Sequence, residues 1–381
     1  MLTSIEQVKP ALPRQSSTTY LPQLDGLRFF AVGLVLYDHW AIGYNTLPLG
    51  PLGVVLFFVL SGFLITRILF ASQSADTYTD KPNLRRYLTR FYIRRSLRIF
   101  PVYYACLLVM YLTDVPPVRE KFWWCALYAT NLYVAFTGQW LGLLDHSWSL
   151  AVEEQYYLIF PLLLFCIPKR QAPFFFLFLI AGSVYFRFWL HQNGHPWTVG
   201  YVSMPGCLDA FGIGALMAYG WLYKPALFNR IFSGYFAIAM SIVLFFTVVL
   251  YSHTFSAYHN IVSDVWERLF AAILSAFLIG RAILGFGQPV RWLLENPVSR
   301  YLGQISYGIY LIHNLVFNYY HTTATSLTLR IWNKAGSYLP VLEEVPQLQV
   351  VYFFALTVLL AALSWHLMEK PINSLKDKFA Y

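Results

Sequence analysis

Apolar stretches of bilayer-spanning length follow one another along almost the whole chain, with short polar segments between them. An α-helix needs about 20 mainly apolar residues to cross the hydrocarbon core of a bilayer. On this basis the sequence predicts an all-α polytopic membrane protein with about ten transmembrane helices. The predicted spans are 24–43, 50–70, 99–113, 148–168, 172–190, 204–222, 233–251, 265–284, 301–320 and 350–369.

The composition agrees with a membrane protein. Hydrophobic residues make up 58% of the chain and charged residues 12%, a surface that no soluble domain of this length could solvate. We expect an N-terminal tail over residues 1–22, a membrane-embedded domain over 23–371 and a C-terminal tail over 372–381. The first region lacks the apolar core of a signal peptide, so the first span is expected to direct insertion.

Basic residues predict the orientation of the chain. Most of the 27 Lys and Arg residues fall on segments that are cytoplasmic if the N-terminus is cytoplasmic. Because cytoplasmic segments of membrane proteins are enriched in Lys and Arg, both termini are predicted to be cytoplasmic. The net charge of +9 is then largely a topology signal, and it requires no nucleic-acid partner.

Arginines recur at every fourth position between residues 83 and 101. Arg86, Arg90, Arg94 and Arg98 therefore share one face of a predicted cytoplasmic interfacial helix that enters the third span. Anchoring to anionic lipid would account for such a face. However, guanidinium groups bind phosphate in a bidentate fork, whereas lysine acts as a point charge. The arginines therefore also fit a phosphate-rich cytoplasmic ligand such as coenzyme A.

The first predicted span carries an arginine and a histidine, Arg28 and His39, eleven positions apart. Eleven residues make three helical turns, so the two side chains lie on one stripe, roughly 16 Å apart along the axis. Ionisable groups inside a membrane are costly and usually line a functional cavity. The spacing indicates a charged ligand that enters near Arg28 and a titratable base deeper on its path, at His39.

Two further spans carry candidate polar groups. Ser61 and Gly62 interrupt a bulky apolar run, which favours close helix packing and would also leave room for a thin substrate. At the start of the fourth span, His146 and Glu153 are seven positions apart and are expected to share a face, whereas Glu154 points about 100° away. A carboxylate on that face could fix the tautomer of a histidine, although a helix cap also explains the polar residues before the span.

The carboxyl-terminal half supplies supporting candidates. Asp209 lies in a span rich in small residues, where a buried carboxylate needs a partner such as an arginine. Ser306 and His313 are seven positions apart in the ninth span, and His366 is expected to be an ordinary core histidine. Walker, G-x-S-x-G, H-E-x-x-H and C-x-x-C motifs are absent from the sequence, so neither a metal site nor a bound cofactor is expected.

Seven segments taken together resemble the acyltransferase-3 family of integral membrane O-acyltransferases. The resemblance extends from Leu24 to about Pro371, and it is closest to the stand-alone form without an SGNH hydrolase-like domain. The segments are, in order, LDGLRFFAV, FFVLSGFL, RRSLRIFP, HSWSLAVEEQYYLIFP, CLDAFGIGALMA, GQISYGIYLIH and EKP.

The resemblance implies a multi-pass enzyme of the bacterial cytoplasmic (inner) membrane. Its donor would be a cytoplasmic acyl-CoA, expected to be acetyl-CoA, and its acceptor a carbohydrate or lipid-linked glycan at the outer side. The resemblance also implies functional roles for the matching charged residues. With the patterns above, we predict catalytic roles for His39, Arg28 and Glu153, acyl-CoA binding by Arg94, Arg95, Arg98 and Ser61, and supporting roles for His146, Asp209 and His313.

Several interpretations stay open at the level of sequence. His39 could act as a general base on an acceptor hydroxyl or could carry the acyl group covalently, and both roles are compatible with the sequence. A transporter or flippase of a glycan intermediate is the alternative function, because charged residues in spans also line transport paths. The two halves of the chain lack the internal similarity that transporters usually have. Membrane lipid is a further expected partner, and no oligomeric state is assigned.

Overall fold

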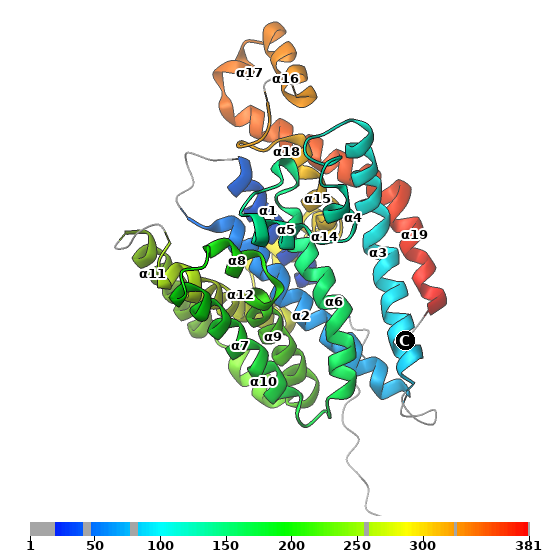
Figure 1. Cartoon of the computed structure of the whole chain (residues 1–381), viewed down its shortest axis with the longest axis vertical. Coiled ribbons are helices and arrows are strands. Elements are labelled where there is room, and N and C mark those ends of the chain that lie inside the picture. The colour runs from blue at the N-terminus through cyan, green and yellow to red at the C-terminus, as the bar shows by residue number, and fades with distance from the viewer. Residues whose placement is uncertain (1–19, 41–46, 77–82, 255–258, 324–325, 380–381) are drawn as a thin grey trace, which may run out of the picture.

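The computed structural model describes residues 20–40, 47–76, 83–254, 259–323 and 326–379. Within these ranges the chain folds into helices joined by turns and loops, and no strand occurs (Figure 1). The predicted all-α fold is therefore confirmed. The predicted N-terminal tail lies almost entirely outside the described residues.

The first half of the chain contains the following helices. They are α1 (Pro22–Trp40), α2 (Leu49–Asp76), α3 (Leu84–Leu112), α4 (Phe122–Ala126), α5 (Thr130–Thr137), η1 (Gly142–Leu144), α6 (Ser147–Cys166) and α7 (Ala172–Gln192). The middle of the chain continues as α8 (Trp197–Val202), α9 (Met204–Tyr223), α10 (Pro225–Phe232), α11 (Tyr235–Thr254), η2 (Val262–Trp266) and α12 (Glu267–Leu284). The remaining helices are α13 (Val290–Glu295), α14 (Pro297–Gln304), α15 (Ser306–Val316), α16 (Leu327–Tyr338), α17 (Val341–Glu344), α18 (Pro346–Ser364), η3 (Trp365–Glu369), α19 (Lys370–Ser374) and η4 (Leu375–Phe379).

Seven helical stretches in the described part of the chain are long and apolar enough to cross a membrane. They correspond to α2, α3, α6, α7, α8 with α9, α11, and α18 with its continuation. The other three predicted spans coincide with α1, α12 and the α14–α15 pair. Helices α1 and α12 each carry three Asp, Glu, Lys or Arg residues, and α15 has only 11 residues. The count of ten spans thus stays a prediction.

The predicted arginine helix enters the third predicted span as one continuous helix. It forms the first part of α3, which continues without a break through Pro101 into the predicted third span. The arginines of this segment therefore have fixed directions relative to the membrane-spanning half of the same helix.

Helix α2 lies at the centre of the bundle and packs most extensively against α9, with α1 and α12 as further neighbours (Figure 1). Two glycines allow the α2–α9 contact. A Cβ on Gly62 would overlap the carbonyl oxygen of Phe211, and a Cβ on Gly214 would overlap the carbonyl oxygen of Val59. Small residues at such crossings let membrane helices approach closely. The packing role predicted for Gly62 is thus confirmed.

Replacing Gly214 by alanine is expected to destabilise the fold. The added methyl group meets backbone atoms of α2, which cannot move aside as a side chain could, so the free energy of unfolding should fall by about 1–3 kcal/mol. Gly182 on α7 is the matched control, because no atom lies within 4 Å of a Cβ placed there. Thermal unfolding midpoints of the two purified alanine variants test this contact, and equal midpoints would contradict it.

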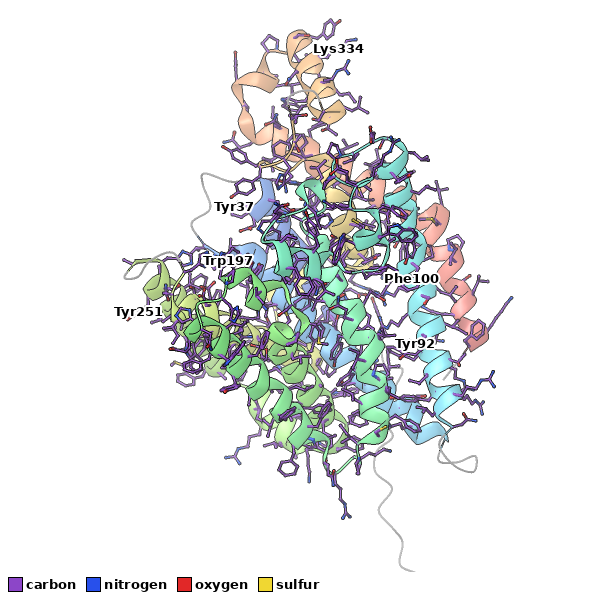
Figure 2. All side chains as sticks on the ribbon, in the orientation of Figure 1. Tyr37, Tyr92, Phe100, Trp197, Tyr251 and Lys334 are labelled. Carbon is purple, nitrogen blue, oxygen red and sulfur yellow. The ribbon has the colours of Figure 1, made fainter. Side chains whose placement is uncertain are left out.

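The outer helices present large apolar side chains on their exposed faces. Phe236 on α11 is 77% exposed and Phe174 on α7 is 74% exposed. Such surfaces are normal where a helix faces lipid and would be a liability in water. The α16–α17 segment stands clear of the bundle at one end, where Lys334 projects from α16 (Figures 1 and 2). The carboxyl-terminal helices return along α3 to the opposite end (Figure 1).

Candidate active site

Two cavities formed by the described residues contain the predicted site residues Arg28 and His39. The first, which we call the arginine pocket, has a volume of about 100 Å³. Its charged lining residues are Arg28, Arg95, Arg98, Glu153 and Glu154. The second, which we call the histidine cavity, has a volume of about 620 Å³. Its histidines are His39, His146, His253, His259 and His321. The stripe on α1 thus has its two ends in different cavities, Arg28 in the first and His39 in the second.

Three arginines from two helices converge on the arginine pocket. Arg28 of α1 forms an ion pair with Asp25, one turn earlier, at 2.9 Å. Arg95 of α3 lies with its guanidinium 5.3 Å from the centre of the Tyr157 ring, a cation–π arrangement. Arg98 is one turn further along α3 and also lines the pocket. Guanidinium groups are suited to an anionic, phosphate-bearing group, and three of them surround this small space.

A carboxylate network forms the opposite wall of the arginine pocket. The Ser61 hydroxyl of α2 donates to Glu153 Oε1 at 2.8 Å, and the Tyr157 hydroxyl donates to Ser61 Oγ at 3.0 Å. These bonds fix the Glu153 carboxylate near the arginines. Glu154, which sequence reasoning directed away from the site, lines the same pocket. Both glutamates therefore line the arginine pocket. Helical periodicity predicted an inward position for Glu153 only.

Arg94 is not brought into the arginine pocket with its neighbour. Its guanidinium donates to the carbonyl oxygens of Lys376 at 2.9 Å and Phe379 at 3.2 Å, in the carboxyl-terminal helix η4. Arg94 therefore links α3 to the end of the chain. Of the three arginines predicted to bind acyl-CoA, the structure brings Arg95 and Arg98 together and separates Arg94 from them.

A hydrogen-bond chain sets the tautomer of His39 in the histidine cavity. The carbonyl oxygen of Tyr310 can only accept, so Nδ1–H of His313 donates to it at 2.6 Å. With neutral rings, Nε2 of His313 then accepts from Nδ1–H of His39 at 2.7 Å. The remaining ring nitrogen of His39, Nε2, carries the lone pair. His313 is wholly buried, which fixes both rings in place. The chain thus leaves His39 with a basic nitrogen, as catalysis by a histidine requires.

A second chain of fixed polarity ends on His146. The backbone N–H of Tyr320 donates to Asn318 Oδ1, so the Asn318 amide nitrogen donates to Asn314 Oδ1. The Asn314 amide nitrogen in turn donates to Nδ1 of His146 at 2.8 Å. The proton of His146 therefore resides on Nε2. That N–H is buried and has no hydrogen-bond partner among the residues that the structure describes. An unpaired buried donor costs about 1–3 kcal/mol, which makes it a candidate substrate contact.

Similarity to known proteins identifies the family of this chain. A family model described as an acyltransferase domain, acyltransferase-3, matches residues 21–369. The chain belongs to this family. It is 27% identical to the peptidoglycan O-acetyltransferase OatA of Listeria monocytogenes, over 94% of this chain and 56% of the relative. It is 29% identical to YrhL of Bacillus subtilis, named as a putative peptidoglycan O-acetyltransferase, over 93% of this chain and 55% of the relative.

The chain spans about half the length of the curated relatives that it matches. A Staphylococcus aureus protein named as a putative O-acetyltransferase is a third example, 27% identical over 93% of this chain and 57% of the relative. No solved structure matches the chain. Together with its apolar helices, membership of the acyltransferase-3 family makes this chain a multi-pass membrane protein.

The residues predicted for the acyltransferase site do not all lie in one cavity. His146 lies in the histidine cavity and Glu153 in the arginine pocket, so their shared helical face does not bring them into one cavity. Asp209 is fully buried and forms an ion pair with Arg187 at 2.6 Å, which gives it the arginine partner that its burial requires. This pair joins α7 to α9, and only its Arg187 member lines a cavity.

The histidine cavity also contains groups that sequence reasoning missed. Trp197 stacks on His259 with ring centres 4.3 Å apart, and Asp145 accepts a 2.7 Å hydrogen bond from His321. Burial raises the pKa of the Asp145 carboxyl, and the charge and hydrogen bond of His321 oppose that rise. Aromatic faces next to hydrogen-bonding groups can hold a hydroxyl-rich ligand. Among the described residues, no group of histidine, cysteine and carboxylate side chains is arranged to hold a metal ion.

Proposed function

We propose that this protein is a membrane O-acyltransferase that moves an acyl group from acyl-CoA to a hydroxyl of a carbohydrate or lipid-linked glycan. The observation that carries the proposal is the pairing of two cavities. One is lined by Arg28, Arg95 and Arg98, the other holds a histidine with a basic nitrogen, and the two share part of their lining. The family and the names of the relatives support acyl transfer, and those of OatA and YrhL support a peptidoglycan-like acceptor.

The arginine pocket is the proposed donor site. Coenzyme A carries a 3′-phosphate and a pyrophosphate, which suit guanidinium groups. The positive-inside distribution of Lys and Arg supports ten spans with both termini in the cytoplasm, so that the donor enters from that side of the bacterial inner membrane. Arg28, nearer than His39 to the start of α1, would help to hold the donor, with acetyl-CoA as the proposed form.

The proposed chemistry is direct transfer with His39 as general base. An acceptor hydroxyl gives its proton to Nε2 of His39 as its oxygen bonds to the thioester carbon. His313, acting through His39, accepts the Nδ1–H bond and so supports the imidazolium that forms. The tetrahedral intermediate then collapses, the C–S bond breaks, and the leaving thiolate takes the proton back from His39. The N–H of His146 is the proposed donor to the oxyanion.

Thioester cleavage by the purified full chain tests this function. Incubation with acetyl-CoA in detergent should release coenzyme A thiol, and a soluble oligosaccharide acceptor should increase the rate. A transporter or flippase would bind or move a glycan without cleaving the thioester, so absence of thiol release would favour that alternative. Radiolabelled acetyl-CoA distinguishes the two mechanisms, because label retained on the denatured protein would identify an acyl-enzyme and overturn direct transfer.

A lysine double substitution tests the donor site. Replacing Arg95 and Arg98 by lysine keeps the positive charge and the topology signal but removes the bidentate fork. Acyl-CoA binding should weaken by about 1–3 kcal/mol for each charge-assisted hydrogen bond that the substitution removes, measured as a rise in KM for acetyl-CoA. The single Arg94→Lys variant is the matched control, because Arg94 binds the end of the chain instead. Equal KM values in wild type, control and double variant would contradict the assignment.

A further inference from the structure

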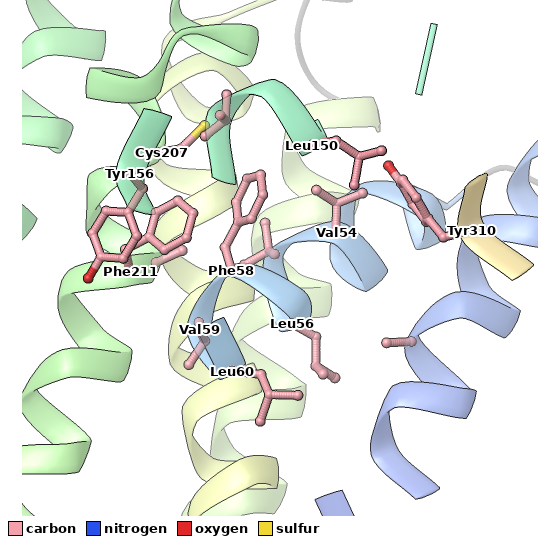
Figure 3. Packing of buried hydrophobic residues seen from close by; sticks show 14 of the residues in the cluster. Val54, Leu56, Phe58, Val59, Leu60, Leu150, Tyr156, Cys207, Phe211 and Tyr310 are labelled. Atoms are coloured by element: carbon pink, nitrogen blue, oxygen red, sulfur yellow. The ribbon is translucent and has the colours of Figure 1, made fainter. Parts of the chain in front are cut away.

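The arginine pocket and the histidine cavity are separated by a wall that is one side chain thick. Three residues line both spaces: Val54 and Phe58 of α2, and Tyr310 of α15. Where one side chain lines both cavities, that side chain alone separates them. All three are at most 8% exposed, so the wall is closed in this structure. Figure 3 shows Val54 lying between Tyr310 and Phe58, with Leu150 above it.

Two of the three wall residues are held on several sides. The Tyr310 hydroxyl lies 2.6 Å from Ser149 Oγ and 3.1 Å from the carbonyl oxygen of His146. The Phe58 ring stacks on Phe211 at 4.8 Å and meets Trp148 edge-on at 6.1 Å. Val54 has neither a hydrogen-bonding group nor an aromatic ring. Val54 is also the smallest of the three wall residues. It can therefore be changed with the least effect on its neighbours.

We propose that Val54 determines the acyl chain length that the enzyme accepts. This inference rests on the proposed function, in which the donor occupies the arginine pocket and His39 acts from the histidine cavity. The acyl carbon must then react at the wall, because Val54, Phe58 and Tyr310 are the only described residues that line both cavities. The new ester bond to the acceptor oxygen forms there and the thioester C–S bond breaks there, with the proton passing from the hydroxyl through His39 to the leaving thiolate.

The small volume of the arginine pocket explains why Val54 would limit the length of the acyl chain. The arginine pocket holds only about 100 Å³, and its lining includes the apolar side chains of Val54, Phe57 and Leu150. The acyl group of a short donor fits against Val54, whereas each added methylene must displace it. Cutting valine back to alanine removes two methyl carbons at that point. Longer acyl groups should then reach the wall without displacing α2.

Substrate profiles of Val54→Ala test the proposal. We expect the ratio of kcat/KM for butyryl-CoA to that for acetyl-CoA to rise by about tenfold or more, since one methylene in an apolar pocket discriminates by roughly 10–200-fold. Val59→Ala is the matched control, a fully buried valine on the same helix that lines neither cavity. Its ratio should equal that of wild type. Thiol release by purified protein, with water or a soluble oligosaccharide as acceptor, gives the rates.

The opposite change closes the wall further. Val54→Phe should lower acetyl-CoA turnover by on the order of a hundredfold while coenzyme A binding, measured by calorimetry, stays within about twofold of wild type. If Val54→Ala turns over acetyl-CoA with an unchanged butyryl-to-acetyl ratio, Val54 does not set chain length, although the proposed function stands. If wild type releases no thiol from any acyl-CoA, the proposed function fails and this inference fails with it.

Discussion

Replacing His39 by alanine is expected to abolish acyl transfer while the protein still inserts and folds. Nε2 of His39 is the lone-pair nitrogen left by the hydrogen bonds through His313 and the Tyr310 carbonyl. General-base catalysis contributes typically 10²–10⁴-fold to a rate, so residual activity should be near background. Acetyl-CoA binding should persist, because the arginine pocket contains no part of His39. Steady-state thiol release and calorimetric binding measure the two effects separately.

The control for this variant is His366→Ala. His366 lies on the carboxyl-terminal helices, bonds to the Tyr301 hydroxyl at 3.1 Å and lines neither cavity. Its loss should leave turnover close to wild type. Activity above a few per cent of wild type in His39→Ala would remove His39 from the chemistry. A parallel loss of folded protein in His39→Ala alone would indicate a packing role instead.

The positions of the helices were predictable where the length of an apolar stretch alone determines them. Each predicted span coincides with one helix or helix pair, because burying backbone polar groups in lipid leaves helices as the only local solution. The number of spans stays a prediction, since α1 and α12 carry charged residues among their apolar ones. The continuation of the arginine segment into the third span was predicted, and Pro101 inside α3 does not interrupt the helix.

The candidate site was predictable in its residue types and less so in its geometry. Helical spacing put Arg28 and His39 on one stripe, and both line cavities. Spacing within one helix carries no information on contacts between helices, so it could not reveal that His39 bonds to His313 across 274 positions. For the same reason it could not separate Arg94 from Arg98, with which it shares a helical face, or place Glu154 in the same pocket as Glu153. Those outcomes depend on which neighbouring helix each side chain meets.

The hydrogen bond between His39 and the buried His313 is the basis of the second large prediction. His313 touches no substrate in the proposed mechanism and acts through His39, so it is a positioning residue. Its Nε2 accepts the Nδ1–H of His39 and thereby holds the lone pair on the reacting nitrogen. His313→Leu should therefore lower kcat by on the order of 10²–10⁴-fold, as loss of the orienting group does in histidine-based triads. The KM for acetyl-CoA should stay unchanged, because the arginine pocket is separate.

A conservative variant separates positioning from packing at this site. Glutamine at position 313 offers a carbonyl oxygen that can accept from Nδ1–H of His39, whereas leucine offers none. His313→Gln should therefore recover at least about tenfold of the kcat lost in His313→Leu, even if the two variants unfold at similar temperatures. A purely structural role would make kcat follow thermal stability instead. Equal kcat values for the glutamine and leucine variants would show that His39 reaches its reactive tautomer without the help of His313.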